Sequence, residues 1–360
     1  MKRLLVALGV LVALLAAGTT SAATVIPVMT GLDNPRGLDF GPDGALYVAE
    51  AGRGGPGPPN RVMRGIPQGW GATGAISRLR NGVQEKWITG LPSFAGPNGF
   101  EAEGVQGVAF AYDRIPFFGR GDAYVTMGFG QDAATRATYG AAGVLFGKLL
   151  RIAPSRAITE VADITAFDSA TNPDGGPSDS NPFRVLPLSR WQLVADAGGN
   201  TVYRVAGGSV FSHAVFAPPR PNPTPIGPPV IESVPTSMAI GPDGAVYVSE
   251  LTGVPFLTGF ARIFRVNLDG SISVVATGLT AVVDIAFGPD GQLYALQHGA
   301  CGPFFACPGN IVRVAAAAPH VVIAGGFIRP GGMTIGPDGA FYVTQRSLDA
   351  GIGEVLRIVP

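Results

Sequence analysis

The chain of 360 residues contains 25 Lys and Arg and 25 Asp and Glu, so its formal net charge at pH 7 is zero. A chain without excess positive charge lacks the basic surface typical of proteins that bind nucleic acid or anionic lipid. Charged residues make up only 14% of the chain, whereas Gly and Pro number 53 and 32, which is typical of many short strands joined by many turns.

Residues 1–23 are predicted to be a signal peptide. Lys2 and Arg3 precede an apolar stretch from Leu4 to Ala17, and small residues at positions 21–23 suit cleavage by a signal peptidase. The apolar stretch is short for a stable membrane span, and no second long apolar run follows it. We therefore expect residues 24–360 to form one soluble domain, secreted to the periplasm or the extracellular space as a monomer without membrane contact.

A stretch of ten residues recurs along the chain and predicts its architecture. It reads GPDGALYVAE at 41–50 and GPDGAVYVSE at 241–250, and looser copies begin at Gly288 and Gly336. In each copy an apolar strand leads into Gly-Pro-Asp-Gly, which favours a tight turn, and a second strand follows at once. The third strand has the form apolar-apolar-Arg-apolar and occurs six times, at 76–79, 149–152, 202–205, 263–266, 311–314 and 355–358. Its arginines are interpreted as bonding loops or carboxylates within each unit.

A fourth strand, at 85–91 and 274–279, completes units of the size of a propeller blade. The last unit has no room for this strand before Pro360, but residues 25–32 after the signal peptide match it. The sequence therefore predicts an all-β fold, a six-bladed β-propeller closed by an N-terminal strand that completes the last blade. A closed ring leaves few sheet edges exposed. A solenoid of the same repeats is the alternative, and the fourth strand disfavours it.

This blade pattern resembles the six-bladed NHL and TolB-like propellers. More closely, TGLDNPRGLDFGPDGALYVAEAG at 30–52, GPNGFEAEGVQGVAF at 96–110 and VADAGGN at 194–200 resemble, in this order, the ScyD/ScyE family of secreted bacterial proteins. The resemblance spans essentially the whole mature chain. It implies a propeller fold and an exported location, but no established reaction.

The chain has two cysteines, Cys301 and Cys307. In an oxidising compartment a close pair most simply forms one local disulfide. Two free thiols or a metal site are the alternatives, and the absence of a nearby set of His and Cys partners disfavours zinc.

The connections of the predicted propeller differ between its two faces. Turns between strands one and two, and between strands three and four, are compact and share one face, which we call the turn face. The opposite face, called the long-loop face, receives the insertions at 51–74, 127–147, 165–182 and 217–235 and the hairpin from Cys301 to Cys307. Long loops on a rigid scaffold often carry function, so we expect the site on the long-loop face.

Polar side chains that close the second strand are the main site candidates. Topology puts them near the channel mouth on the long-loop face, together with the acidic segment that enters blade two. The candidate ligand-binding residues are Glu50, Glu101, Glu103, Asp196, Asn200, Glu250, Gln297, His298 and Gln345. The alternative to a binding role, and the favoured interpretation of the carboxylates, is that they cap loop backbone amides or pair with arginines such as Arg36 and Arg346.

A minority interpretation of the same carboxylates is a cation site. Convergent carboxylate and amide oxygens suit calcium, with Glu50, Glu103, Asp196 and Glu250 as ligands. Lactonases among the six-bladed propellers use a metal in this channel, and Glu103-Gly104 is similar to the Glu-Gly of their metal-binding segment. Calcium is the only ion this pattern suggests, and no other cofactor is assigned.

Motifs of catalysis are missing from the sequence. No GxSxG elbow or HExxH pair occurs, and GRGGPG at 52–57 leads into prolines rather than a helix. The favoured function is therefore a secreted, non-catalytic propeller that binds a small molecule, glycan or protein partner through its long-loop face, with no catalytic residue assigned. A metal-dependent, lactonase-like hydrolase is the alternative. A quinoprotein-like dehydrogenase is third, disfavoured because the chain has only three histidines.

Overall fold

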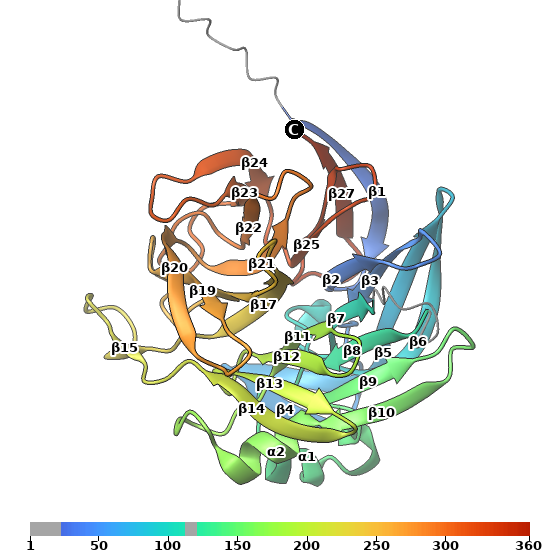
Figure 1. Ribbon diagram of the computed structural model, residues 1–360. Coiled ribbons are helices and arrows are strands. Elements are labelled where there is room, and N and C mark those ends of the chain that lie inside the picture. The colour runs from blue at the N-terminus through green and yellow to red at the C-terminus, as the bar shows by residue number, and fades with distance from the viewer. Residues whose placement is uncertain (1–22, 112–120) are drawn as a thin grey trace, which may run out of the picture.

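The computed structural model describes residues 23–111 and 121–360, and six sheets surround a central channel, five with four strands and one with a fifth (Figure 1). This confirms the predicted fold class, a nearly all-β six-bladed propeller. The signal peptide remains a prediction, because residues 1–22 lie outside the described residues. None of the described helices is long and apolar enough to cross a membrane.

Each blade is an antiparallel sheet whose first strand is innermost, and these first strands neighbour one another around the ring. Blade one contains β2 (Pro35–Phe40), β3 (Leu46–Glu50), β5 (Ile66–Arg80) and β6 (Val83–Ala95). Blade two contains β7 (Val105–Phe110), β8 (Ala123–Met127), β9 (Lys148–Ile152) and β10 (Ile158–Asp163). Blade three contains β11 (Pro182–Pro187), β12 (Gln192–Asp196), β13 (Thr201–Ala206) and β14 (Ser209–Val215).

The second half of the ring repeats this order. Blade four contains β17 (Pro235–Ile240), β18 (Val246–Glu250), β19 (Ala261–Val266) and β20 (Ile272–Leu279). Blade five contains β21 (Val282–Phe287), β22 (Leu293–Gln297), β23 (Gly309–Arg313) and β24 (Val321–Phe327). Blade six contains β25 (Gly332–Ile335), β26 (Phe341–Gln345), β27 (Gly353–Val359) and, from the other end of the chain, β1 (Thr24–Leu32).

The ring closes as predicted, because β1 pairs antiparallel with β27 from Thr24 opposite Val359 to Leu32 opposite Gly353. Figure 1 shows the blue N-terminal strand beside the red C-terminal strand. Met29 and Leu32 are almost fully buried, so this strand contributes core as well as backbone hydrogen bonds. The last blade is therefore completed by residues from both ends of the chain.

The Gly-Pro-Asp-Gly turn is held by its own blade. Asp43 accepts hydrogen bonds from the amide of Ala45 at 3.2 Å and the hydroxyl of Tyr47 at 3.1 Å. A Cβ on Gly41 would lie 2.6 Å from the Tyr47 ring, and Gly44 has a φ of +73°, so both positions require glycine. The amide bond and the ring contact recur in the copies that begin at Gly241, Gly288 and Gly336, and the tyrosine bond recurs in the last two.

Four of the six repeating arginines form ion pairs with a carboxylate of their own blade at the turn face, which confirms their structural interpretation. The nearest N–O distances are 3.7 Å for Arg78–Asp43, 2.9 Å for Arg151–Asp122, 2.9 Å for Arg265–Asp243 and 2.7 Å for Arg357–Asp338. In blade three, Arg204 instead lies over the rings of Trp191 and Phe211.

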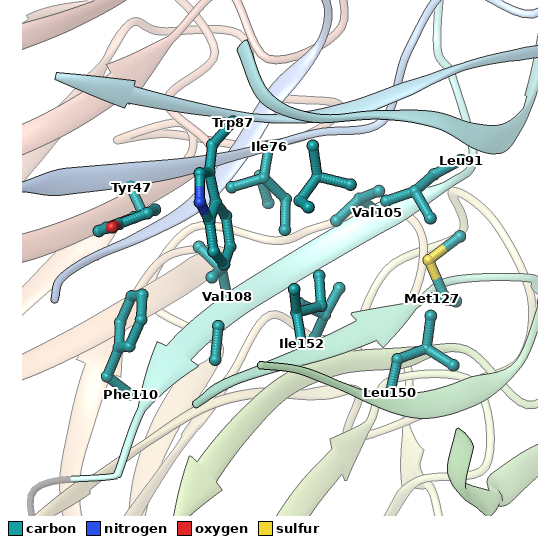
Figure 2. Close-up of a cluster of buried hydrophobic side chains, with 14 of the residues drawn as sticks. Tyr47, Ile76, Trp87, Leu91, Val105, Val108, Phe110, Met127, Leu150 and Ile152 are labelled. Atoms are coloured by element: carbon teal, nitrogen blue, oxygen red, sulfur yellow. The ribbon is translucent and has the colours of Figure 1, made fainter. Parts of the chain in front are cut away.

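The hydrophobic core lies between neighbouring blades. Figure 2 shows one such cluster, formed by side chains of blades one and two. Tyr47 packs edge-on against Trp87 with ring centroids 5.0 Å apart and contacts Phe110 at 4.7 Å. Each sheet therefore buries both of its faces, which fixes the innermost strands around the channel.

The insertions of the long-loop face contain regular structure that the sequence did not predict. Residues 51–74 are not an irregular loop: β4 (Gly57–Met63) pairs with the first half of β5 as a hairpin. The second insertion holds α1 (Ala133–Thr138) and the 3-10 turn η2 (Gly140–Gly143), and the third holds α2 (Ile164–Thr171). Asp132 and Asp163 cap the two α-helices by accepting from the amides of Thr135 and Ala166. The fourth holds β15 (Arg220–Pro221) and β16 (Val230–Ile231), and η1 (Pro97–Gly99) precedes blade two.

The predicted disulfide is confirmed. Cys301 and Cys307 are bonded, with their Cα atoms 5.2 Å apart, in the connection between β22 and β23. No cysteine of the chain is free.

Candidate functional site

Carboxylates that close the second strand are held by their own blades. Glu50 is fully buried and accepts from the amide of Asp33 at 2.7 Å, from the hydroxyl of Ser77 and from the Lys86 ammonium at 2.5 Å. Its charge is thus used to fix the chain entering blade one.

Blades three and four repeat this arrangement with different partners. Asp196 accepts from the hydroxyl of Ser180 and from the amides of Asn181, Gly198 and Gly199 at 2.6–3.1 Å. Burial raises its pKa, and these hydrogen bonds act in the opposite direction. Glu250 pairs with Arg220 at 3.0 Å and Arg262 at 2.8 Å and accepts from the hydroxyl of Ser233.

The amide candidates also bond locally. Gln297 accepts from the amide of Thr280 at 2.6 Å, and Gln345 accepts from the amide of Ile328 at 3.2 Å. Asn200 accepts from the amide of Val234 at 2.9 Å and donates to Asp174 at 2.9 Å.

The expected convergence of Glu50, Glu103, Asp196 and Glu250 on one cation is not what the structure shows. Each carboxylate is directed to the amides, hydroxyls or basic side chains of its own blade or of the segment entering it. Across residues 23–111 and 121–360, no three His, Cys, Asp or Glu side chains are grouped so that they could hold a metal ion. The arrangement matches the capping alternative.

Glu103 differs from the other carboxylates, because its side chain meets polar groups of the innermost strands. Its backbone bridges to Phe94, and its Oε2 accepts from Nε2 of Gln106 at 2.9 Å. Arg36, near the start of β2, donates to the carbonyl of Ala102 at 2.8 Å. Arg36 Nε and Gln106 Oε1 are both buried without a hydrogen-bond partner. We call Arg36, Glu103 and Gln106 the mouth cluster, since all three lie where the chain enters the ring from the long-loop face.

The β4–β5 hairpin adds two arginines to this region. Arg61 is buried, donates to Gln68 at 2.8 Å and to the carbonyl of Phe129 at 3.0 Å, and lies 4.4 Å from the centre of the Phe94 ring. Arg64, at the hairpin tip, forms an exposed ion pair with Glu101 at 2.7 Å. The hairpin thereby ties blade one to the acidic segment that enters blade two.

The charge of Glu103 affects the pKa of three arginines in and beside the mouth cluster. Burial lowers the pKa of Arg36 and of Arg61, and the charge of Glu103 acts in the opposite direction on both. Partial desolvation by the surrounding chain lowers the pKa of the largely exposed Arg64, but the charges of Glu103 and Glu101 outweigh this effect and raise the pKa overall. Glu103 therefore lies in a positive field made by three arginines.

His298, the remaining candidate, is buried beside the disulfide hairpin. Its Nδ1 lies 2.8 Å from the carbonyl oxygen of Pro330, and its ring packs against Phe305 with centroids 4.6 Å apart. Burial lowers its pKa to about 4, so the imidazole is neutral at pH 7 and Nδ1 donates the proton of this bond. Its role in this arrangement is packing.

A guanidinium group crosses the central channel. Arg184 of β11 donates to the carbonyls of Gln106 at 2.6 Å and Gly331 at 2.7 Å, and its Nη2 lies 3.3 Å from Oδ2 of Asp284. A Cβ on Gly37 would lie 2.8 Å from the Arg184 guanidinium carbon, so this glycine makes room for the group.

Two hollows lie on opposite faces. A shallow pocket of about 280 Å³ on the long-loop face is lined by Arg53 and Asn98 among glycines. A larger cavity of about 610 Å³ opens on the turn face, and Arg184 and Asp284 are among its lining residues. Sequence reasoning missed this second cavity, although Asp39 in GLDF and Asp284 in DIAF directly precede the repeated turns and offered a signal.

No family model matches the chain, and no curated protein matches its sequence. Among solved structures it is similar to a putative oxidoreductase (glucose dehydrogenase) from Thermus thermophilus, with a TM-score of 0.54 and 18% identity over 94% of this chain and 100% of that chain. It is similar to the PQQ-bound aldose sugar dehydrogenase from Streptomyces coelicolor, with a TM-score of 0.53 and 14% identity over 93% and 98% of the two chains. It is also similar to a putative gluconolactonase, with a TM-score of 0.50 and 12% identity over 95% of this chain and 92% of that chain. At these identities the likeness shows the fold alone, a six-bladed β-propeller.

Proposed function

We propose that this protein is a secreted six-bladed propeller that binds a small hydroxyl-rich molecule, or the end of a glycan, on its long-loop face without changing it chemically. The observation that carries the proposal is the mouth cluster, in which a buried donor and a buried acceptor lack partners beside Glu103. Leaving such groups unpaired is costly, and Nη2 of the neighbouring Arg61 is a further buried donor without a partner. They favour a ligand that supplies what is missing.

A hydroxyl group fits this need, because it both donates and accepts hydrogen bonds. One hydroxyl would accept from Arg36 Nε, and another would donate to Gln106 Oε1. The neighbours of Glu103 are arginine and amide side chains, which donate hydrogen bonds but exchange no proton at neutral pH. This set of groups suits binding better than acid–base catalysis.

Access to the cluster would require a small movement of the β4–β5 hairpin. Its tip is held to blade two by the pair of Arg64 with Glu101, and the Arg64 side chain is 66% exposed. Exposed ion pairs of this kind contribute only about 0–1 kcal/mol. We propose that breaking this pair lets the hairpin tip move and admit the ligand, while Arg61 and Gln68 hold the rest of the hairpin through their bonds to the carbonyls of Phe129 and Glu101.

Export is the second part of the proposal. The disulfide between Cys301 and Cys307 fits an oxidising compartment, and the order of motifs along the chain resembles the ScyD/ScyE family. We propose membership of this family and secretion as a monomer.

Isothermal titration calorimetry with a panel of monosaccharides, oligosaccharides and sugar lactones tests the proposal. At least one hydroxyl-rich compound should bind the wild type, and Glu103→Gln should weaken its binding about tenfold, because Glu103 Oε2 accepts from Gln106 Nε2 and thereby fixes Gln106 Oε1 for the ligand. Glu85→Gln, an exposed change of the same type on blade one, should leave binding unchanged. Absence of binding across the panel would reject the proposal. Hydrolysis of a lactone in the presence of calcium would instead support the hydrolase alternative, and mass spectrometry of the purified protein would reveal a bound quinone.

A further inference from the structure

The turn-face cavity is a compartment separate from the mouth cluster. Arg184 spans the channel between them, bonded to blades two, five and six. Glycine at position 332 also accommodates this group, because a Cβ there would lie 2.7 Å from Arg184 Nη2. The Arg184 guanidinium therefore closes the inner end of the cavity to a molecule that enters from the turn face.

The cavity has the size and lining of a small-molecule site. Its volume of about 610 Å³ lies within the range of about 300–1,000 Å³ that is usual for such sites. Its walls come from the first strands of all six blades and are mostly aliphatic, including Leu38, Val108 and Met238. The charged residues of the lining are Asp39, Arg184 and Asp284, and Ser189, Ser237 and Thr334 add hydroxyl groups.

The charges at the inner end are already balanced. Asp284 accepts from the Arg184 guanidinium at 3.3 Å, from the amide of Met333 at 2.9 Å and from the hydroxyl of Ser237. This pair is almost fully buried and contributes no net charge to the cavity.

Asp39, on the wall, is not balanced in this way. Within residues 23–111 and 121–360, the hydrogen bonds to its carboxylate come from two backbone amides, those of Phe40 at 2.8 Å and Phe110 at 3.0 Å. In the part of the chain that the structure describes, no Arg or Lys lies within ion-pair distance of it. Once ionised, it gives the described lining of the cavity one net negative charge in a largely apolar surrounding, where a cationic partner would be attracted most strongly.

We propose that the turn-face cavity binds a small organic cation, an ammonium group carried on a compact apolar body. The ammonium contacts Asp39, and the apolar body packs against the aliphatic walls. This site is independent of the glycan site proposed for the long-loop face.

The probe is 2-phenylethylammonium, titrated calorimetrically into the mature protein at pH 8. Its controls are 2-phenylethanol and 3-phenylpropionate, which have a similar apolar body with no charge or a negative charge. The ammonium should bind at least about tenfold more tightly than either control, the usual effect of a charge-assisted hydrogen bond. Equal binding of the alcohol, tighter binding of the anion, or no ammonium binding at about 10 mM would overturn the proposal.

Substitution of Asp39 locates the site. Asp39→Asn should remove the preference for the cation, whereas Asp269→Asn, which removes an exposed carboxylate from the same face, should keep it. Thermal melting of both variants shows whether they remain folded. A folded Asp39→Asn protein that still prefers the cation would contradict the proposal.

The wild type provides a further test that needs no variant. Burial raises the pKa of Asp39 to about 7, its two amide hydrogen bonds act in the opposite direction, and the neighbouring charge of Asp284 adds to the rise. The charged groups that line the cavity beside Asp39 are Arg184 and Asp284, which remain paired. Cation affinity should therefore fall as the pH is lowered from 8 to 5.5. An affinity that stays constant over this range would contradict the assignment to Asp39.

Discussion

Arg184 and Asp284 lie 100 residues apart in the chain but meet across the central channel, with Nη2 of the arginine 3.3 Å from Oδ2 of the aspartate. The first residue belongs to blade three and the second to blade five, and the arginine also bonds to carbonyls that precede or belong to blades six and two. A single guanidinium therefore ties together strands that have no direct hydrogen bonds to one another.

Removal of this guanidinium should destabilise the ring. Arg184→Met leaves Asp284 buried without its cation and two carbonyls without donors, a change that typically costs about 3–5 kcal/mol. Urea denaturation followed by tryptophan fluorescence measures the loss. Arg357→Met breaks an exposed pair with Asp338 and should cost no more than about 1 kcal/mol. Similar losses for the two variants would show that the channel arginine has no special structural role.

Closure by the N-terminal strand predicts a second effect. A chain that begins at Asp33 lacks β1, so β27 becomes an unpaired sheet edge and the core around Val355 loses Met29 and Leu32. Exposed edges promote aggregation. Compared with a chain that begins at Ala23, the truncated protein should melt at a much lower temperature and form oligomers in light scattering. Equal melting temperatures would mean that the ring does not need its N-terminal strand.

The fold was predictable because its signals are local and repeated. Copies of GPDG fix the turn between strands one and two, and an arginine in strand three marks each blade, even where the turn motif has changed. Blade three illustrates this: it lacks GPDG, and a turn closed by the Leu188 amide and the Trp191 carbonyl replaces it. A repeat of this kind needs no knowledge of long-range contacts to be recognised.

The site was predictable only in part, because it depends on contacts between distant segments. The residues at the end of strand two were correctly placed at loop connections, but their partners, such as Arg220 and Lys86, come from segments without a repeat. Arg61 was missed because its hairpin is an insertion found in one blade. The role of Arg184 follows from ring closure, which no local pattern reveals.

Acid should destabilise the protein through His298. Burial lowers its pKa to about 4 in the folded state, against an ordinary value of 6.5, so the unfolded chain binds the proton first as the pH falls. The stability from this group is fully present above about pH 6.5 and is lost as the pH falls toward 4. A difference of about 2.5 units corresponds to about 3 kcal/mol.

His298→Gln isolates this contribution. Glutamine at position 298 cannot titrate. The difference in unfolding free energy between wild type and variant should therefore shrink, or change sign, as the pH falls from 7 to 4.5. Partly buried carboxylates such as Asp179, whose pKa desolvation raises to about 7, titrate in both proteins and cancel in the difference. A difference independent of pH would show that His298 is not buried in its neutral form.

The disulfide should have a local effect. The two cysteines are six positions apart, and closing so short a loop contributes at most about 2–3 kcal/mol in the chain-entropy account. Replacing both cysteines with serine should loosen the hairpin around Phe305 without unfolding the ring, and hydrogen exchange would show faster amide exchange confined to this segment. Alkylation of both thiols in the unreduced protein would contradict the bonded state.

Calcium should leave the stability of the protein unchanged. Carboxylates crowded without partners would repel one another, and a cation that relieved the repulsion would raise the melting temperature with the logarithm of its concentration. Glu50, Asp196 and Glu250 instead have hydrogen-bond donors or basic partners within their own blades, and Glu103 accepts from Gln106. Thermal melts of the wild type and of Glu103→Gln, in calcium, magnesium and chelator, should therefore coincide within each protein. A rise with calcium in the wild type that disappears in Glu103→Gln would restore the cation site and with it the hydrolase alternative.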